Sequence, residues 1–383
     1  MSALRWNGVG RARRAAVTFG MAVVVAVGMP SAAHASVSAT PDDTAAVAGS
    51  VYGLAQAGDR TVVGGLFTKM GGKPRANVAA VRPDGTVDPA FIANTDGKVE
   101  AVAVSEDGTR VFIGGTFTTV NGVPRANLAA VDAATGAVID GWSADTGGLS
   151  PTVKTLWVQG ARLYVGGTYN GIGSTGRSKL AAVATDSSAV ITSFNPRANG
   201  AVKEVVASPD GSTVFAGGGF TSLGGASREH RTGAVHASTG AATSFVPAEG
   251  GGSVVTVALS PDGSRFFFST ENNNIFAYDY ATSNAPVWVT KTSGNTQAMA
   301  VSQTEMYIGG HFSGFQGYNV KRPYLASVNP ANGVPTAWDT KAVGGKMGVW
   351  ALLIEGSHVH AGGVFSTFNL DSQRGYARFT GTP

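Results

Sequence analysis

The stretch VFIGGTFTTVNGVPRANLAAVD, residues 111–132, recurs in altered form along most of the chain. Each copy has an apolar run that ends in Gly-Gly and, after a polar loop, a second apolar run of the type Leu-Ala-Ala-Val. The Gly-Gly pairs begin at Gly64, Gly114, Gly166, Gly217, Gly309 and Gly362. Successive pairs are therefore 50, 52, 51, 92 and 53 residues apart. The long gap is nearly twice the others, and the run FFFS at 266–269 marks a degenerate copy within it, so the sequence predicts seven copies.

Each copy contains four strand-like stretches, which in the second copy are 99–105, 110–117, 128–132 and 137–142. Val, Ile, Phe and Thr favour strands, whereas the Gly, Asp and Pro between these stretches favour turns. No stretch after residue 35 has a sustained helical period. Four strands in a unit of about 40 to 50 residues are typical of propeller blades. A solenoid is the alternative, although its repeats are usually shorter and its two ends need polar caps.

The two ends of the chain favour a ring. The seventh copy has three strands, the last near 376–380, and the segment 36–50 resembles the fourth strands of other copies. An N-terminal strand that completes the last blade would remove the exposed sheet edges. The sequence thus predicts an all-β fold: a seven-bladed β-propeller of four-stranded blades, closed by an N-terminal strand and forming a single domain over 36–383. The approximate repeats are 51–98, 99–150, 151–200, 201–252, 253–294, 295–346, and 347–383 plus 36–50.

The first 35 residues are typical of a secretory signal peptide. Four arginines without an acidic residue precede an apolar segment over 15–29, and AHA at 33–35 has the small-x-small pattern of a cleavage site. About 15 apolar residues are too few to span a bilayer comfortably. We therefore expect a secreted, extracellular protein without a membrane segment after cleavage. The pair Arg13-Arg14 leaves twin-arginine export open beside the general secretory route.

Composition narrows the class of protein. Hydrophobic residues make up 43% of the chain and charged residues 14%, which suits a folded core and excludes a disordered chain. Of 28 basic residues, four lie in the predicted signal peptide, so 24 remain against 24 acidic ones. Because phosphate binding needs a clustered basic surface, we expect no nucleic-acid partner. The absence of cysteine excludes disulfides and thiolate metal sites.

The repeat also carries a family likeness. The motifs IGGTF at 113–117, GVPR at 122–125, LAAVD at 128–132 and TG at 135–136 resemble the delta-60 repeat of secreted bacterial β-propellers. The resemblance covers nearly the whole chain after residue 35, clearly in six copies, and it fails in the shorter fifth copy. It implies an extracellular propeller in a family of unknown function, and it implies neither a catalytic activity nor a cofactor.

An arginine follows the Gly-Gly pair at the same place in most copies. These residues are Arg75, Arg125, Arg177, Arg322 and Arg374, with Arg228 or Arg231 in the fourth copy. A ring of guanidinium groups could bind carboxylates or phosphates. Because an identical residue in every unit usually serves the unit, we expect each arginine to hold its own loop to nearby carbonyls or to an Asp of a neighbouring strand. For the glycines we expect a bulge or a close backbone approach rather than a phosphate site.

Ligand sites are expected where the copies differ. The second residue of each first strand varies: Tyr52, Glu100, Lys154, Lys203, Val255, Gln297 and Trp350. The first strand of a propeller blade is innermost, so these side chains, together with Glu204, should surround one mouth of the central channel. Such a mouth suits a small polar ligand, for example a sugar that stacks on Trp350 or Tyr52. The alternative is that the side chains only line a wet channel and neutralise one another.

Catalysis has weaker support in the sequence. His358 and His360 would share one face of a strand, but we find no carboxylate or third histidine with suitable spacing, and we predict no metal site. His311 could form an acid/base pair with a Glu of another blade. We therefore predict a monomeric, non-enzymatic binding or interaction module for a glycan, a cell-envelope component or a small polar ligand, without cofactors. The alternatives are a small-substrate hydrolase or lyase that uses channel residues, and a purely structural envelope protein.

Overall fold

The computed structural model describes residues 37–383, so the predicted signal peptide lies outside the described range. Within this range the protein contains strands and turns and no helix, which confirms the all-β prediction. None of the described residues belongs to a helix that could cross a membrane.

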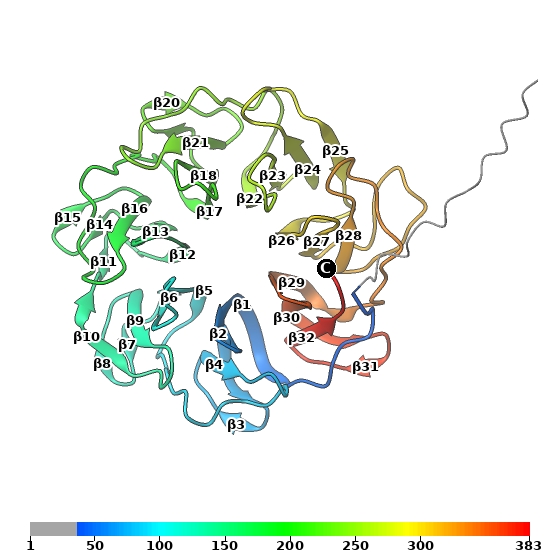
Figure 1. The fold of residues 1–383 in the computed structure, drawn as a ribbon, viewed down its shortest axis with the longest axis horizontal. Coiled ribbons are helices and arrows are strands. Elements are labelled where there is room, and N and C mark those ends of the chain that lie inside the picture. Colours follow the sequence, from blue (N-terminus) through cyan, green and yellow to red (C-terminus); the bar gives the residue numbers. More distant parts are fainter. Residues whose placement is uncertain (1–36) are drawn as a thin grey trace, which may run out of the picture. The chain divides into compact units, whose positions relative to one another are not determined.

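Seven of the sheets follow one antiparallel plan, in which the first strand pairs with the second and the second with the third. The first strands lie innermost (Figure 1) and are β1 (Val47–Ala57), β5 (Val99–Val104), β12 (Val153–Gln159), β17 (Val202–Ala207), β22 (Val254–Leu259), β26 (Thr296–Val301) and β29 (Val343–Glu355). The second strands are β2 (Arg60–Met70), β6 (Arg110–Gly115), β13 (Arg162–Gly167), β18 (Thr213–Gly218), β23 (Phe266–Thr270), β27 (Met306–Gly310) and β30 (His358–Phe368). The third strands are β4 (Val78–Val81), β9 (Leu128–Asp132), β16 (Leu180–Ala184), β21 (Thr232–His236), β24 (Asn274–Tyr278), β28 (Leu325–Val328) and β32 (Tyr376–Thr380).

Two-residue strands lie in the loops between the second and third strands and in one connection between sheets. They are β3 (Lys73–Pro74), β7 (Thr119–Val120), β8 (Val123–Pro124), β11 (Thr146–Gly147), β14 (Gly171–Ile172), β15 (Thr175–Gly176), β19 (Ser222–Leu223), β20 (Ala226–Ser227) and β31 (Asp371–Ser372). Some of them form small hairpins within a loop, as β7 does with β8 and β19 with β20, whereas β3 and β31 pair with the ends of β2 and β30.

The fourth strand is less regular than the sequence predicted. In the described range only β10 (Val138–Ser143) and β25 (Trp288–Lys291) form one. In four other sheets the segment is reduced to a single bridge: Val81 with Val87, Val183 with Val190, Val235 with Ala242, and Val328 with Pro335. In the first and sixth copies Pro89 and Pro335 explain why no longer fourth strand forms, because proline has no N–H to donate to a ladder.

The segment ahead of β1 lies along the last sheet. The backbone N–H of Ser38 donates to the Thr380 carbonyl over 2.8 Å, and that of Asp42 donates to the Arg378 carbonyl over 2.7 Å. The Asp42 carboxylate also accepts from Arg378 Nε over 2.6 Å. Val37 is buried, and Trp338 Nε1 donates to the Ser38 carbonyl. The first described residues are therefore bonded to the last strand, although they do not form a regular strand themselves.

The Gly-Gly pair permits two close approaches. A Cβ on Gly114 would lie 2.4 Å from Val153 Cγ1 in the next sheet, and a Cβ on Gly115 would lie 2.0 Å from the Lys98 carbonyl oxygen. Both distances are shorter than a normal contact, so a larger residue would force its neighbours to shift, and the expected close approach is present. The same contact with the next sheet occurs in the pairs Gly64–Val99, Gly166–Val202, Gly217–Val254, Gly309–Val349 and Gly362–Val51.

The hydrophobic cores lie between neighbouring sheets. One cluster joins Val62 of β2 to Ile113 of β6, and another joins Val51 of β1 to Tyr376 of β32. Inner strands also pack against one another in sequence order, and β29 packs against β1. Each sheet thus buries its two faces against two neighbours, as expected for a propeller.

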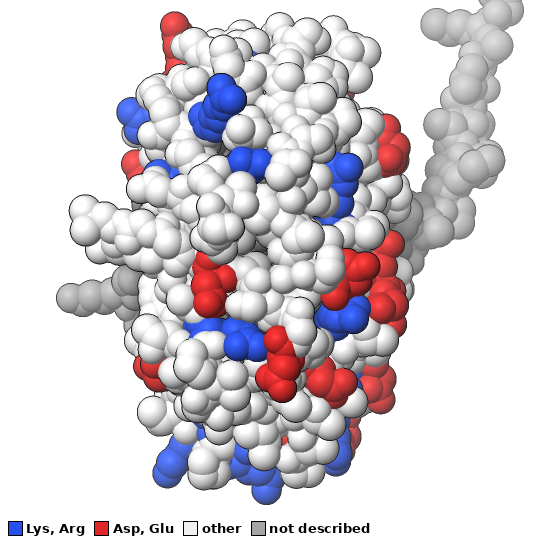
Figure 2. Space-filling view, turned by 90° about the vertical axis from the view of Figure 1, so that its left-hand side faces the viewer, with Lys and Arg blue, Asp and Glu red and all other residues white. Residues whose placement is uncertain are grey.

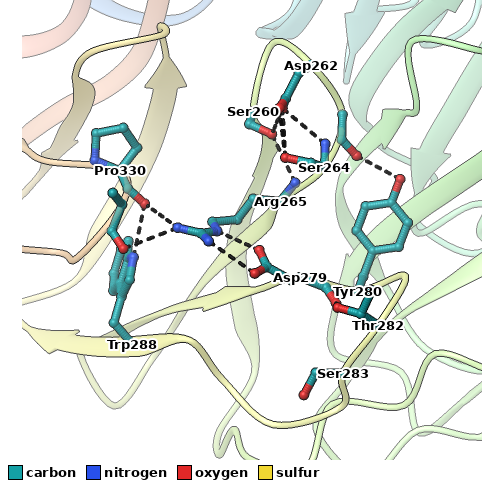
Figure 3. Close-up of polar contacts among 12 residues, drawn as sticks. Ser260, Asp262, Ser264, Arg265, Asp279, Tyr280, Thr282, Ser283, Trp288 and Pro330 are labelled. Atoms are coloured by element: carbon teal, nitrogen blue, oxygen red, sulfur yellow. Dashed lines mark hydrogen bonds and ion pairs between the residues drawn. The ribbon is translucent and has the colours of Figure 1, made fainter.

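A second group of arginines, which the sequence analysis did not single out, links neighbouring sheets. Arg265 at the edge of β23 donates to both Asp279 oxygens, over 2.7 and 3.1 Å, and reaches the Pro330 carbonyl of the next sheet over 3.1 Å (Figure 3). Trp288 Nε1 donates to the same carbonyl over 3.0 Å. The equivalent donors to the next sheet are Arg60, Arg162 and Arg378.

A glycine substitution tests the contact between sheets. We expect Gly114→Ala to lower the free energy of unfolding by about 1–3 kcal/mol, because the added methyl group overlaps Val153 and the core must shift. The matched control is Gly141→Ala, since Gly141 is exposed, has open space around its Cα, and lies in a strand of the same sheet. Urea unfolding of both variants gives the comparison, and equal losses would contradict the proposed role of the contact.

Candidate functional site

Each inner strand contains a β-bulge at the position that the sequence analysis selected. In β5, Val99 pairs with Gly115 and Ala101 pairs with Gly114, so Glu100 is an extra residue without an opposite partner. A bulge bends the strand and redirects the side chain of the extra residue. The same register shift occurs at Tyr52, Lys154, Lys203, Gln297 and Trp350, and at 255–256 in the fifth copy.

The bulged residues share one cavity. Its volume is about 1030 Å³, and all seven inner strands contribute to its lining. The lining includes each residue predicted for the mouth: Tyr52, Glu100, Lys154, Lys203, Glu204, Val255, Gln297 and Trp350. It also includes further polar residues that the sequence did not predict, among them Lys98, Glu271 and Asn295. The structure therefore brings the predicted residues together, while ligand binding by them stays a prediction.

Aromatic and charged groups follow one another along one part of the cavity. The rings of Trp350 and Tyr52 meet edge to face with their centroids 5.2 Å apart, and Lys98 Nζ lies 5.3 Å from the Tyr52 centroid. Glu100 binds two lysines: its Oε1 lies 2.6 Å from Lys98 Nζ, and its Oε2 lies 3.3 Å from Lys154 Nζ. The charges on this side are therefore largely paired before any ligand arrives.

A second charge pair lies on β17 and the loop after β23. Lys203 Nζ is 2.7 Å from Glu271 Oε1, and this hydrogen bond lowers the pKa of Glu271. Asn295 Nδ2 donates to the Glu271 carbonyl over 3.0 Å. Two buried polar atoms of the lining, Gln297 Oε1 and Trp350 Nε1, have no hydrogen-bond partner among the described residues. Buried polar groups are normally paired, so these two atoms would gain a hydrogen bond if a ligand reached them through a movement of their side chains.

Glu204 differs from the other carboxylates of the cavity. Thr155 Oγ1 donates to its Oε1 over 2.8 Å, and no lysine binds it in the described structure. Burial raises the pKa of Glu204 to about 7, and the hydrogen bonds from Thr155 and the Val205 N–H lower it only in part. The side chain is half-buried at the cavity wall, so a proton can be exchanged near neutral pH.

His311 does not join this group. Its side chain is exposed beside Gly294, and it is not part of the cavity lining. The acid/base pair that the sequence suggested between His311 and a channel Glu is therefore not formed in the described structure.

The repeated arginines bind carbonyls at the edge of their own sheets. Arg75 Nη2 donates to the Asp88 carbonyl over 3.1 Å, and Arg177 Nη2 donates to the Thr192 carbonyl over 3.0 Å. Arg125, Arg322 and Arg228 make equivalent bonds to the carbonyls of Ile139, Trp338 and Phe245. These contacts hold the loop to the segment after the third strand, which is the structural role that we expected.

Arg374 does not make the contact that the other repeated arginines make, so its assignment to this series was wrong. Its side chain is exposed, and the neighbouring Gln373 is buried and donates from Nε2 to the Asp42 carbonyl over 2.9 Å. The next-but-one residue after Arg75 has positive φ, as does Gly375 after Gln373. The loop of the last copy is therefore aligned one residue away from the sequence prediction, and a glutamine takes the place of the arginine.

The predicted absence of a carboxylate near His358 and His360 also needs correction. Glu355 lies opposite His358 across the β29–β30 hairpin, and the potential ligand atoms of all three residues lie within 4.8 Å of one another. These residues could hold a metal ion, and the sequence analysis missed Glu355.

Comparisons with known proteins support the fold. A family model described as a domain of unknown function (DUF5122) beta-propeller matches residues 56–91. The crystal structure of the computationally designed Ika8 protein is similar with a TM-score of 0.55 and 11% sequence identity, over 88% of this chain and 97% of that one. A search of curated proteins found no match. The comparisons show a β-propeller and leave its activity open.

Figure 2 shows acidic and basic residues interspersed on one side of the molecule.

Glu204 gives the protein a predictable dependence of stability on pH. Its pKa is near 7 in the folded protein and near 4.5 in the unfolded chain, so the folded state binds the proton more tightly between these values. Stability should therefore fall as pH rises from about 4.5 to 7, by at most about 3 kcal/mol from this group. Glu204→Gln should remove that part of the dependence, so its melting temperature relative to wild type should rise with pH. A difference that stays constant across this window would contradict the raised pKa.

Proposed function

We propose that the chain is a secreted member of the delta-60 repeat propellers, and that residues 36–383 form a single seven-bladed ring that acts as an extracellular binding module. The segment ahead of β1 would close the ring. Its backbone bonds to β32, the contact of β29 with β1 and the packing of Gly362 on Val51 support this closure. The match of a propeller family model to 56–91, which includes the first Gly-Gly pair, supports the family.

The ligand that fits the cavity best is a neutral, hydroxyl-rich molecule such as a carbohydrate. The observation that carries this proposal is the convergence of two aromatic rings, Tyr52 and Trp350, with two unpartnered polar atoms, Trp350 Nε1 and Gln297 Oε1. An indole donor and an amide acceptor match hydroxyl groups, and aromatic rings match the apolar face of a sugar. The lysines and glutamates are already paired with one another, so the cavity does not favour a strongly charged ligand.

Binding can be measured on a glycan array and by pull-down with cell-envelope fractions. We expect Trp350→Ala to weaken binding at least about tenfold, because a buried aromatic anchor commonly contributes more than 1.4 kcal/mol. Glu100→Ala should also weaken binding, because it releases Lys98 and Lys154 into the cavity.

Two controls match these variants. Tyr318→Ala removes an exposed aromatic side chain outside the cavity, and Glu229→Gln removes an exposed carboxylate. Both should bind as wild type does. A blank array for the wild-type protein, or equal binding by Trp350→Ala, would refute a carbohydrate site in this cavity.

A hydrolase or lyase is a second candidate, and Glu204 is the observation that favours it. A carboxyl group with a pKa near 7 in a cavity suits general acid/base catalysis. Under this alternative, Glu204→Gln abolishes turnover of a substrate that wild type converts, without lowering the melting temperature, and His311→Ala leaves turnover unchanged. A broad panel of glycosides and uronides that shows no turnover by wild type would remove this alternative.

A further inference from the structure

The hairpin between β29 and β30 gathers three potential metal ligands on one face. Glu355 and His358 are the last register pair before the two-residue turn, and His360 lies two residues further along β30. Residues i and i+2 of a strand share a face, and directly opposed residues of a hairpin are neighbours. The potential ligand atoms of Glu355, His358 and His360 accordingly lie within 4.8 Å of one another.

His360 has the features of a prepared ligand. Its side chain is buried, with 3% of the residue exposed, and its Nδ1 lies 2.8 Å from the Tyr376 hydroxyl and 3.4 Å from Thr61 Oγ1. Its Nε2 is buried and has no hydrogen-bond partner among the described residues. When Nδ1–H donates to the Tyr376 oxygen, Nε2 carries a free lone pair. A hydrogen bond to the second ring nitrogen is also how proteins orient a metal-binding histidine.

We propose that Glu355, His358 and His360 form a binding site for one divalent transition-metal ion, with Zn²⁺ as the best-matched common ion. Two imidazoles and one carboxylate are a known ligand set for zinc, and they leave a fourth position open. Imidazole favours zinc, copper and nickel, whereas magnesium and calcium prefer oxygen ligands throughout. This inference does not depend on the proposed ligand of the central cavity.

The charges around the hairpin are compatible with a cation. Arg378 lies opposite His360 on β32, but its guanidinium is paired with the Asp42 carboxylate at 2.6 Å. The Glu355 carboxylate then supplies the negative ligand that a divalent ion needs.

The burial pattern indicates how the site would close. His360 is fixed in the core, whereas Glu355 and His358 are half-buried and open to solvent. Zinc is bound at about 2.0–2.2 Å by nitrogen and carboxylate oxygen, so the two outer side chains must turn inward toward His360. His360 is thus the anchor, and the other two residues complete the site from the surface.

Zinc binding can be tested on the chain that begins at Ser36, purified without a polyhistidine tag and stripped with a chelator. Competition against a chromophoric zinc indicator should show saturation at one ion per chain. His358→Ala and Glu355→Gln should each weaken the affinity at least about tenfold. The control is His236→Ala, which removes an exposed strand histidine outside the cluster and should bind as wild type does. Excess Mg²⁺ or Ca²⁺ should not displace zinc.

Tyr376→Phe tests the role of His360 without emptying the core, which His360→Ala would do. We expect the affinity of Tyr376→Phe to fall about 10- to 100-fold, as is usual when the partner of a ligating histidine is lost. At the same zinc concentration, zinc should raise the melting temperature of wild type more than that of His358→Ala. The proposal is overturned if stripped wild type takes up no more zinc than His358→Ala. It is also overturned if Tyr376→Phe binds zinc as tightly as wild type, because His360 would then not be the anchor.

Discussion

The contact between the first glycine of each Gly-Gly pair and the residue directly before the bulge of the next inner strand determines how closely neighbouring sheets approach. At Gly114 the missing Cβ leaves room for the Val153 side chain, and a larger residue would displace that side chain. The fifth copy has Ser269 at this place, and its hydroxyl donates to the Thr296 carbonyl of the next sheet over 2.7 Å. A hydrogen bond there replaces the packing contact, which explains how the degenerate copy keeps its place between two regular ones.

The same contact also positions the cavity residues. Val153 is held against Gly114, and the next residue, Lys154, is the extra residue of the bulge. The structural requirement therefore falls on the valine, and the residue after it is free to differ from copy to copy. Because every inner strand repeats this arrangement, one set of residues maintains the fold while the adjacent set, from Tyr52 to Trp350, defines the chemistry of the cavity.

This division explains which features the sequence predicted and which it did not. The place directly after the repeated valine identifies Glu100 and its equivalents from the alignment of the copies alone. Lys98 and Glu271 were missed because they lie outside the regular strands, where only the folded chain brings them near Glu100 and Lys203. Glu355 is hard to predict for another reason: it does not share the strand of the two histidines and reaches His358 across a hairpin turn.

The irregular parts of the fold also differ in how far the sequence predicts them. Pro89 and Pro335 could have predicted the loss of two fourth strands, since a residue without an N–H cannot extend a ladder. The exposed position of Arg374 could also have been predicted, because Arg75, Arg125 and Arg177 each follow the first glycine of their pair by 11 residues, as Gln373 does, whereas Arg374 follows Gly362 by 12. An alignment that is shifted by one residue still places a polar side chain in the loop, so the kind of residue alone does not reveal the shift. In the folded chain the positive φ of Gly375 fixes the alignment.

The two proposed sites share a strand and remain separate in space. Trp350 lies near the start of the regular part of β29 and Glu355 at its end, so about 3.3 Å per residue puts roughly 16 Å between their Cα atoms. Trp350 belongs to the cavity, whereas Glu355 is absent from its described lining and belongs to the opposite, hairpin end of the sheet. Between them β29 is paired continuously with β30 from Ala351 to Glu355, which fixes both ends in one rigid ladder. A metal ion at the hairpin could therefore stabilise the last sheet, where the two chain ends meet, without touching a ligand in the cavity.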